Sequence, residues 1–285
     1  MTVHDVVRAP VCRVDAAHGS CVAGVRPASV QLQERTVWGQ RMLYREAGSK
    51  ENPTVLLLHG MAATAWNITA LLHSLAPTFH VIAPDHIGAG LHPAPTPATA
   101  EQAIASMGAH VDALMRQLDL VSVGVVAQDI AACVTQQILA AGRANGAVWA
   151  VAVEGLPAGQ GTRSDGLGNR VPAERSAFDR AVHPLLAAHN CAFTLAASTF
   201  RRAGIPTAYF QAQERVPDGW EPNDARPRPR LGRARALTGD VDEHHRAAQL
   251  TYTIDPDGAP ADHELCRLGR WLTRFLAGHA PTRRP

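Results

Sequence analysis

Three short turns, each directly after an apolar run, hold the residues whose types and spacing could do chemistry. The turns are Leu58–Ala62, Ala83–Gly90 and Val126–Ala132. In an open α/β sheet, ligands bind outside the carboxyl ends of the strands, where such turns lie. We therefore expect the reacting side chains of this protein to come from these three segments.

The turn Val126–Ala132 carries an aspartate between small residues. A tight turn from a strand into a helix crowds the residues two before and two after its apex, and Ala127 and Ala131 are both small. Asp129 at the apex would project above the sheet at a helix N-terminus, where the helix dipole favours an anion. An aspartate that only caps the helix is the alternative interpretation of this position.

The other two turns are less specific. The small residues around His59 and Gly60 would let backbone N–H groups face a pocket, and such donors stabilise a developing oxyanion. In the turn Ala83–Gly90, Asp85 fits a structural role in which its carboxylate bonds the local backbone. Neither turn identifies a reaction without the aspartate turn.

The predicted elements alternate between strand and helix after an initial pair of strands. Two antiparallel strands, 30–33 and 36–45, are expected to meet near Gly39. Short apolar runs, typical of strands buried on both faces of a parallel sheet, follow at 55–58, 79–83, 121–127 and 147–153, and two further strands are expected at 206–212 and 249–254. Apolar residues at helical spacing predict helices at 65–75, 101–118, 130–141 and 262–277. This pattern predicts an α/β fold with a mostly parallel central sheet flanked by helices.

The chain divides into a core, an insertion and an N-terminal extension. Residues 1–28 have weak periodicity and are expected to be ordered only in part. Residues 29–155 and 205–285 carry the strand–helix alternation and form the predicted core. Residues 156–204 open with a glycine-rich loop and then become helical. We expect them to form a small helical lid, inserted after the sixth strand, over the carboxyl ends of the strands.

The composition argues against several classes of protein. The formal net charge is +2 with 18% charged residues, whereas nucleic-acid-binding proteins usually have a strongly basic face. No apolar run approaches the roughly 18 residues of a membrane-spanning helix, and the first residues lack the apolar region of a signal peptide. The five cysteines include no CxxC pair, which favours reduced thiols over disulfides or a zinc site. We expect a cytoplasmic protein, compatible with a homodimer, with no metal or other cofactor and no nucleic-acid or membrane partner.

Taken together, the three turns resemble those of the α/β-hydrolase fold superfamily. The segments LLLHG and PDHIGAG and the aspartate turn, which matches the nucleophile elbow, follow in the order and spacing of that superfamily. The likeness continues through 148–161 to the branch of epoxide hydrolases and haloalkane dehalogenases. Residues 206–217 resemble the strand after the lid and residues 271–276 the terminal helix. The resemblance thus extends over most of the chain and implies an α/β-hydrolase fold.

The resemblance also implies roles for particular residues. In the similar enzymes an elbow aspartate, here Asp129, attacks carbon and forms an ester. A histidine after the last strand then activates water to hydrolyse the ester, assisted by a second acid. By the same likeness, the backbone N–H groups of Met61 and Ile130 would form the oxyanion hole. Glu154, which ends the strand before the lid, and Glu214, after the lid, are candidates for the acid, although each also fits an ordinary loop carboxylate.

The sequence departs from the family pattern at the catalytic base. The histidine is expected about where Asp257-Gly258 stands, and the nearest one, His263, comes several residues later, in the predicted first turn of the terminal helix. The lid contains no tyrosine, the residue with which epoxide hydrolases open the ring. Ile130 follows the aspartate where many dehalogenases have tryptophan or arginine. We therefore expect a degenerate triad, with catalytic use of His263 left open.

Without a correctly placed base, an ester on Asp129 would form and stay, so a different chemistry is expected. Burial in an apolar, lid-covered pocket would raise the pKa of Asp129 and suit it to proton transfer. We expect a lyase- or cyclase-type enzyme that performs elimination, addition, cyclisation or isomerisation on a hydrophobic small molecule in natural-product biosynthesis. The residues expected around the pocket are His59, Trp66, His86, Gln128 and His183.

Two alternatives remain open. One is a conventional epoxide hydrolase or dehalogenase, with Asp129 as nucleophile and a histidine moved into place. It needs that histidine within about 3 Å of Asp129 or one water away. The other is a ligand-binding homologue without catalysis, which would keep its affinity for ligand after Asp129→Asn.

Overall fold

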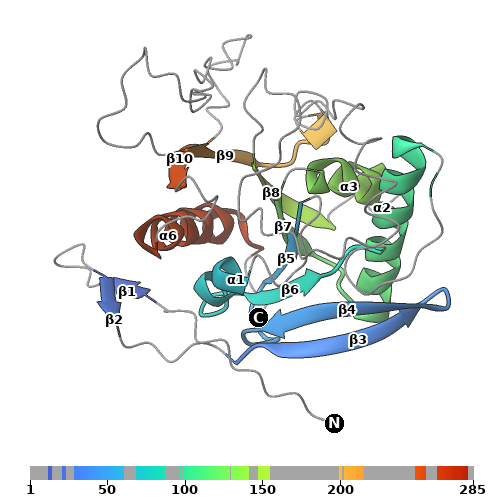
Figure 1. The fold of residues 1–285 in the computed structure, drawn as a ribbon, viewed down its shortest axis with the longest axis horizontal. Helices are drawn as coiled ribbons and strands as arrows, with labels where there is room; N and C mark the ends of the chain where they lie inside the picture. Colours follow the sequence, from blue (N-terminus) through green and yellow to red (C-terminus); the bar gives the residue numbers. More distant parts are fainter. Residues whose placement is uncertain are drawn as a thin grey trace, which may run out of the picture.

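The structure is a computed structural model, shown in Figure 1. The residues that it describes are 12–14, 21–23, 29–60, 69–87, 97, 99–128, 130–140, 147–154, 199–200, 202–214, 248–254 and 262–281. Most of the predicted lid at 156–204 lies outside these ranges, so the lid stays a prediction.

A sheet of eight strands runs through the described part of the chain (Figure 1). In the order in which they pair, the strands are β10 (Ala248–Ile254), β9 (Thr207–Glu214), β8 (Val148–Glu154), β7 (Val123–Ala127), β5 (Thr54–Leu58), β6 (His80–Pro84), β4 (Gln40–Ala47) and β3 (Gln31–Val37). The pairs from β10 to β6 are parallel, and β4 is antiparallel to both β6 and β3. The predicted α/β class with a mostly parallel sheet is confirmed.

Two pairs of helices cover the two faces of the sheet (Figure 1). α1 (Thr69–Leu75) and α6 (Asp262–His279) lie on one face, and α2 (Ala100–Gln117) and α3 (Ala131–Ile138) lie on the other. The buried apolar residues divide in the same way, into one cluster with α2 and α3 and a second with α1 and α6. None of the helices described is long and apolar enough to cross a membrane.

The central strand β5 shows why the sequence pattern is so apolar. Leu56 and Leu58 belong to the cluster with α2 and α3, whereas Val55 and Leu57 belong to the cluster with α1 and α6. Successive side chains of a strand point to opposite faces, so a strand covered on both faces must be apolar at every position. This burial holds the carboxyl end of β5, and the turn that follows it, in a fixed place.

The sequence-based boundaries were wrong at the first hairpin. The prediction gave residues 36–37 to the second strand, but they pair as part of β3. The turn is formed by Trp38 and Gly39, which both have positive φ (47° and 79°). The predicted meeting point near Gly39 is therefore confirmed. The ends of the two strands were misplaced, because a positive φ at tryptophan is not visible in the alternation of residue types.

The structure also differs from the prediction in the N-terminal extension and at the end of α3. In the N-terminal extension, β1 (Cys12–Val14) and β2 (Cys21–Ala23) pair as antiparallel strands that the sequence analysis did not predict. Strands of three residues are too short to show a period-2 pattern. The helix α3 ends at Ile138, before the predicted end at 141.

Candidate active site

The carboxyl ends of β5, β7 and β8 lie level with one another. The register pairs Leu58 with Ala127 and Ala127 with Val153, so the residues that follow these strands emerge at one edge of the sheet. The parallel strand β6 ends beside β5 at the same edge. The predicted site residues that this edge brings together are His59, His86, Gln128 and Glu154.

The turn between β7 and α3 is short and tightly packed. The backbone N–H of Gln128 donates to the carbonyl of Leu58 at 3.0 Å, and the N–H of Ala131 donates to the carbonyl of Gln128 at 2.9 Å. The flanking side chains of Ala127 and Ala131 are completely buried. Small residues at both positions therefore let the strand pass directly into the helix. Asp129, between Gln128 and Ile130 in sequence, lies outside the described residues.

The N-terminus of α3 brings backbone N–H groups to this edge. Ile130 has helical dihedral angles (φ −55°, ψ −26°), and its carbonyl accepts hydrogen bonds from the N–H groups of Cys133 and Val134. The N–H groups of a first helical turn have no acceptor within the helix, so they can bind an anion. The oxyanion role expected of the Ile130 N–H stays a prediction, and this geometry is compatible with it.

Two histidines that follow neighbouring strands, His59 after β5 and His86 after β6, pack against each other. Their ring centroids are 4.3 Å apart, with planes tilted by 55°, and both residues are buried. The backbone N–H of His86 donates to Nε2 of His59 at 2.9 Å, and Nε2 of His86 lies 3.0 Å from the carbonyl oxygen of His59. Nδ1 of His59 lies 2.8 Å from the carbonyl oxygen of Gly60.

These contacts fix most of the protons on the two rings. A carbonyl oxygen only accepts, so Nδ1 of His59 and Nε2 of His86 must each carry a proton and donate it. Nε2 of His59 accepts a backbone N–H and therefore carries no proton. His59 is thus a neutral ring with both nitrogens bonded to backbone, which leaves it unsuited to accept a proton from a substrate or from Asp129.

Burial keeps His86 neutral as well. Burial, together with the neighbouring His59, lowers the pKa of His86 to about 3, although a backbone hydrogen bond with His59 and the charge of Asp85 act in the opposite direction. Among the described residues, Nδ1 of His86 is buried and has no hydrogen-bond partner. A proton at Nδ1 would be a buried positive charge without an acceptor. His86 is therefore neutral, with its proton on Nε2.

Asp85 contacts the neighbouring strand β4, and the predicted bond from its carboxylate to the local backbone stays a prediction. Its N–H donates to the carbonyl of Leu43 at 2.9 Å, and its Oδ1 lies 3.6 Å from Nη1 of Arg45. Both side chains are buried. Burial lowers the pKa of Arg45, and Asp85 partly offsets this effect. The pair joins the end of β6 to β4, and the sequence analysis did not find Arg45, because an arginine on a strand gives no signal that it is buried.

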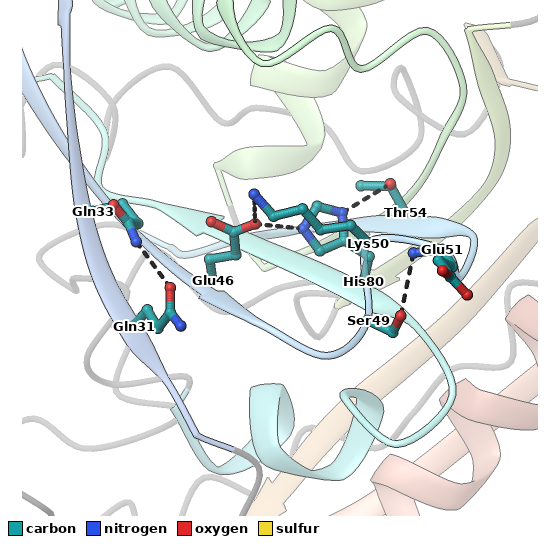
Figure 2. Close-up of polar contacts among 8 residues, drawn as sticks. All are labelled: Gln31, Gln33, Glu46, Ser49, Lys50, Glu51, Thr54 and His80. Carbon is teal, nitrogen blue, oxygen red and sulfur yellow. Dashed lines mark hydrogen bonds and ion pairs between the residues drawn. The ribbon is translucent and has the colours of Figure 1, made fainter.

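A second polar cluster lies at the opposite, amino edge of the parallel strands (Figure 2). His80 begins β6 and Thr54 begins β5, and Nδ1 of His80 lies 3.2 Å from Oγ1 of Thr54. Nε2 of His80 lies 2.8 Å from Oε1 of the buried Glu46, and Nζ of Lys50 lies 3.1 Å from the same oxygen. Because this cluster is at the edge away from the turns, we interpret it as a structural link between β4, β5 and β6.

The remaining candidate residues are only partly described. Glu214 is the last residue of β9, paired in register with Ile254 of β10. His263 is the second residue of α6 and so lies in its first turn, as predicted. Met61, Trp66 and His183 fall outside the described residues. Within the described ranges, no group of three or more His, Cys, Asp and Glu side chains could hold a metal ion.

The sequence analysis missed the reciprocal bonding of His59 and His86. Each histidine was expected to line a pocket, yet their rings bond to each other's backbone. The only signal in the sequence was that both follow buried strands. That signal does not tell whether the strands are neighbours, which the order β7-β5-β6-β4 decides.

Comparisons with known proteins agree with this architecture. The family described as "alpha/beta hydrolase fold" matches residues 53–243. A haloalkane dehalogenase from Bradyrhizobium diazoefficiens is 33% identical over 104 residues, which make up 36% of this chain and 33% of that protein. A solved loop variant of a haloalkane dehalogenase from Bradyrhizobium elkanii has a TM-score of 0.59 at 20% identity, covering 88% of this chain and 98% of the other. Epoxide hydrolase A from Mycobacterium thermoresistibile has a TM-score of 0.55 at 16% identity, covering 89% and 100%.

These comparisons differ in the share of the chain that they cover and in sequence identity. The sequence match spans only a third of the length of the dehalogenase (33%). The solved structures cover nearly all of the chain but share so few residues that they establish the fold alone. The resemblance predicted from the three turns is confirmed, and so is the fold that it implied.

Proposed function

Because the chain belongs to the alpha/beta hydrolase fold family, we propose that it is an enzyme with Asp129 as its reacting group. Its substrate is a hydrophobic small molecule, and its chemistry is proton transfer rather than hydrolysis. Elimination, addition, cyclisation and isomerisation are the reactions that fit, in the biosynthesis of a natural product. The fold supports only the position of the site, so the reaction is argued from the residues around it.

One observation carries the proposal, namely the tight turn that joins β7 to α3. Its flanking alanines are completely buried, and its N–H and carbonyl groups tie it to β5 and to the first turn of α3. Gln128 and Ile130 thus lie at the carboxyl edge of the sheet, beside the N-terminus of α3, and we propose that Asp129, which joins them in sequence, acts from this edge. Such a location suits an aspartate that gains or loses a proton during the reaction.

In an elimination, the ionised carboxylate of Asp129 would take a proton from a carbon of the substrate. The electron pair of that C–H bond would form the double bond, and the leaving group would depart with its own bonding pair. The N–H groups of Met61 and Ile130 would stabilise negative charge as it develops. No ester forms on the enzyme in this sequence of steps, and no water is consumed.

The state of the histidines supports the non-hydrolytic chemistry. Hydrolysis of an ester on Asp129 needs a histidine that can accept a proton from water. His59 has both ring nitrogens bonded to backbone, and His86 is a buried neutral ring bonded to His59. His263 belongs to the first turn of α6 rather than to a loop directly after β10. Neither His59 nor His86 has the environment of a water-activating base.

A conventional dehalogenase or epoxide hydrolase is the second candidate. The identity of 33% over 104 residues with a haloalkane dehalogenase favours it. In that case the carboxylate of Asp129 would displace halide, or open an epoxide, to form the ester. A histidine outside the described residues would then have to activate water. A ligand-binding protein without catalysis is the remaining alternative.

The test is mass spectrometry of the intact protein and of the products in ¹⁸O-labelled water. The full-length protein is treated with 1,2-dibromoethane, styrene oxide and a panel of polyketide-like substrates that can eliminate or cyclise. Asp129→Asn is the test variant. Asp119→Asn is the matched control, because it makes the same chemical change at an exposed residue in the turn after α2.

The outcomes separate the three candidates. Turnover that Asp129→Asn abolishes and Asp119→Asn retains, without adduct or label, supports proton transfer. A covalent adduct on the wild type that Asp129→Asn lacks, or ¹⁸O in the product, contradicts it and restores the hydrolase. Ligand binding by Asp129→Asn as tight as that of the wild type, with no turnover in either, favours the binding protein.

A further inference from the structure

We infer that Nδ1 of His86 binds a hydroxyl group of the substrate, which is therefore an uncharged, hydrophobic alcohol or phenol. This inference rests on the proposed function and deepens it, because it names the class of substrate for the same site. The role of His86 is recognition of the substrate and not proton transfer. His86 is then a residue that determines specificity.

The inference starts from a buried ring nitrogen. Only 2% of His86 is exposed, and its Nε2–H donates to the carbonyl of His59 at 3.0 Å, so the free lone pair of the ring is on Nδ1. Nδ1 has no hydrogen-bond partner within the part of the chain that the structure describes. A buried acceptor without a partner costs about 1–3 kcal/mol. Such an atom in a folded protein calls for an explanation, and a bound molecule supplies one.

The charge state of His86 determines which groups can bind there. Burial and the neighbouring His59 lower the pKa of His86 to about 3, so the ring is neutral at neutral and mildly acidic pH. Because Nε2 carries its only proton, Nδ1 can accept a hydrogen bond but cannot donate one. An O–H group satisfies this acceptor, whereas an ether, a ketone, a halide or a carboxylate brings only lone pairs. A protonated amine could donate, but the burial of its charge is costly.

The position of His86 in the fold favours a ligand with an apolar body. His86 follows β6, which ends beside β5 at the carboxyl edge, where open α/β sheets bind their ligands. The next residue, Ile87, is buried in the apolar cluster with α2 and α3. Ligand sites commonly combine apolar walls with a few polar groups that fix the orientation of the ligand. A hydrophobic molecule with a hydroxyl group matches a buried acceptor beside such a cluster.

A buried water is a less suitable partner for Nδ1 than a hydroxyl group of a ligand. A buried water makes about three hydrogen bonds. The polar groups next to the ring are already bonded: the N–H of His86 donates to Nε2 of His59, and the carbonyl of His59 accepts from Nε2–H of His86. Nδ1 of His59 bonds the carbonyl of Gly60. A ligand hydroxyl needs only its one bond to Nδ1, because the apolar body of the molecule supplies the remaining contacts.

Two variants of His86 separate the acceptor from the bond that holds the ring. The amide of His86→Asn reaches the place of Nδ1, so this variant can keep an acceptor there and loses the bond to the carbonyl of His59. The amide of His86→Gln reaches the place of Nε2, so it can keep that bond and loses the acceptor. His279→Gln removes an exposed histidine at the end of α6 and is the control.

The first measurement is nitrogen NMR of the ¹⁵N-histidine-labelled full-length protein. The probes are phenol, 2-naphthol and cyclohexanol, each compared with its methyl ether. Nδ1 of His86 is expected to give the resonance of an unprotonated ring nitrogen, which moves to lower frequency with a hydroxyl compound and not with its ether. A resonance that none of the three hydroxyl compounds moves overturns the inference, including the case in which Nδ1 already bonds an internal water.

The second measurement is the dissociation constant of each probe, determined by calorimetry. At least one hydroxyl compound is expected to bind wild type and His279→Gln at least about tenfold more tightly than its ether, the size of a hydrogen bond to a buried acceptor. The preference is expected to be lost in His86→Gln and kept in His86→Asn. Equal binding of alcohol and ether by wild type, or the same preference in His86→Gln as in wild type, overturns the inference.

Neither measurement needs turnover, so the two proposals can fail separately. If Asp129→Asn is as active as wild type on the substrates tested above, the proposed function fails. The NMR shift and the preference for the hydroxyl compound then still decide whether Nδ1 of His86 binds a hydroxyl group.

Discussion

Lowering the pH from about 7.5 to about 5 is expected to destabilise the protein through His86. Burial and the neighbouring His59 lower the pKa of this residue to about 3, whereas in the unfolded chain it has the ordinary value of about 6.5. Between these two values the unfolded chain binds a proton at His86 and the folded protein does not. The contribution of His86 to stability is therefore complete above about pH 6.5 and is lost progressively as the pH falls toward 3.

The size of the effect follows from the two pKa values. At about pH 5 the unfolded histidine is almost fully protonated, which favours unfolding by about 2 kcal/mol relative to pH 7.5. For a chain of this size, that corresponds to a fall in Tm of very roughly 4–8 °C. The assay is urea unfolding followed by tryptophan fluorescence at both pH values, for wild type and for His86→Gln.

The variant removes the titrating group and keeps a donor to the carbonyl of His59. His86→Gln is expected to be less stable than wild type at about pH 7.5, and this difference is expected to shrink by about 2 kcal/mol at about pH 5. His279→Gln is the control, because it removes an exposed histidine at the end of α6, outside the pair. If His86→Gln and His279→Gln change the pH dependence equally, His86 is not the buried neutral ring described above, and the tautomers assigned to the pair lose their support.

Two further predictions concern the opposite edge of the sheet. Glu46→Gln is expected to lower the free energy of unfolding at neutral pH by about 1–3 kcal/mol, measured by urea unfolding, because it weakens the bonds from His80 and Lys50. Burial opposes ionisation of Glu46, but the bonds from His80 and Lys50 outweigh this effect and lower the pKa of Glu46. The stabilisation is therefore complete above about pH 4.5 and is lost as the pH falls through the pKa of Glu46 in the folded protein. A difference in stability between Glu46→Gln and wild type that does not change with pH would contradict this prediction. Gly48→Ala is expected to cost about 3 kcal/mol or more, measured by thermal unfolding, because φ is +84° and a Cβ would lie 2.0 Å from the carbonyl oxygen of Phe79. Gly278→Ala, where a Cβ meets nothing within 4 Å, is its control, and equal Tm values for the two variants would refute the argument.

The central strands could be predicted well from the sequence, because a strand that is buried on both faces is a continuous run of apolar residues. The runs that became β5 and β7 are apolar at nearly every position, since helices cover both sides of the sheet. The meeting point of the hairpin near Gly39 was predicted correctly, but the ends of its strands were not, because a positive φ at Trp38 cannot be inferred from residue types. The strands β1 and β2 were missed because three residues do not make a pattern.

The sequence also indicated where the candidate site lies. Turns after buried parallel strands meet at one edge, and the register of β5, β7 and β8 brings their ends level there. It further indicated that a histidine is absent from the expected place after the last strand. Those statements need only local sequence and the general rule for open α/β sheets.

What only the tertiary structure decided is the state of the two histidines. Local sequence puts His59 and His86 in separate turns, 27 residues apart, and gives each the same three options: charged, or neutral with the proton on either nitrogen. The pairing of β5 with β6 brings the rings together, and the positions of the backbone carbonyls then determine which ring nitrogens carry a proton. A tautomer depends on which acceptor stands opposite each ring nitrogen, and that acceptor comes from a different part of the chain. For this reason residue types could identify the two histidines as candidates for the site, whereas only the fold showed that they are unsuited to proton transfer.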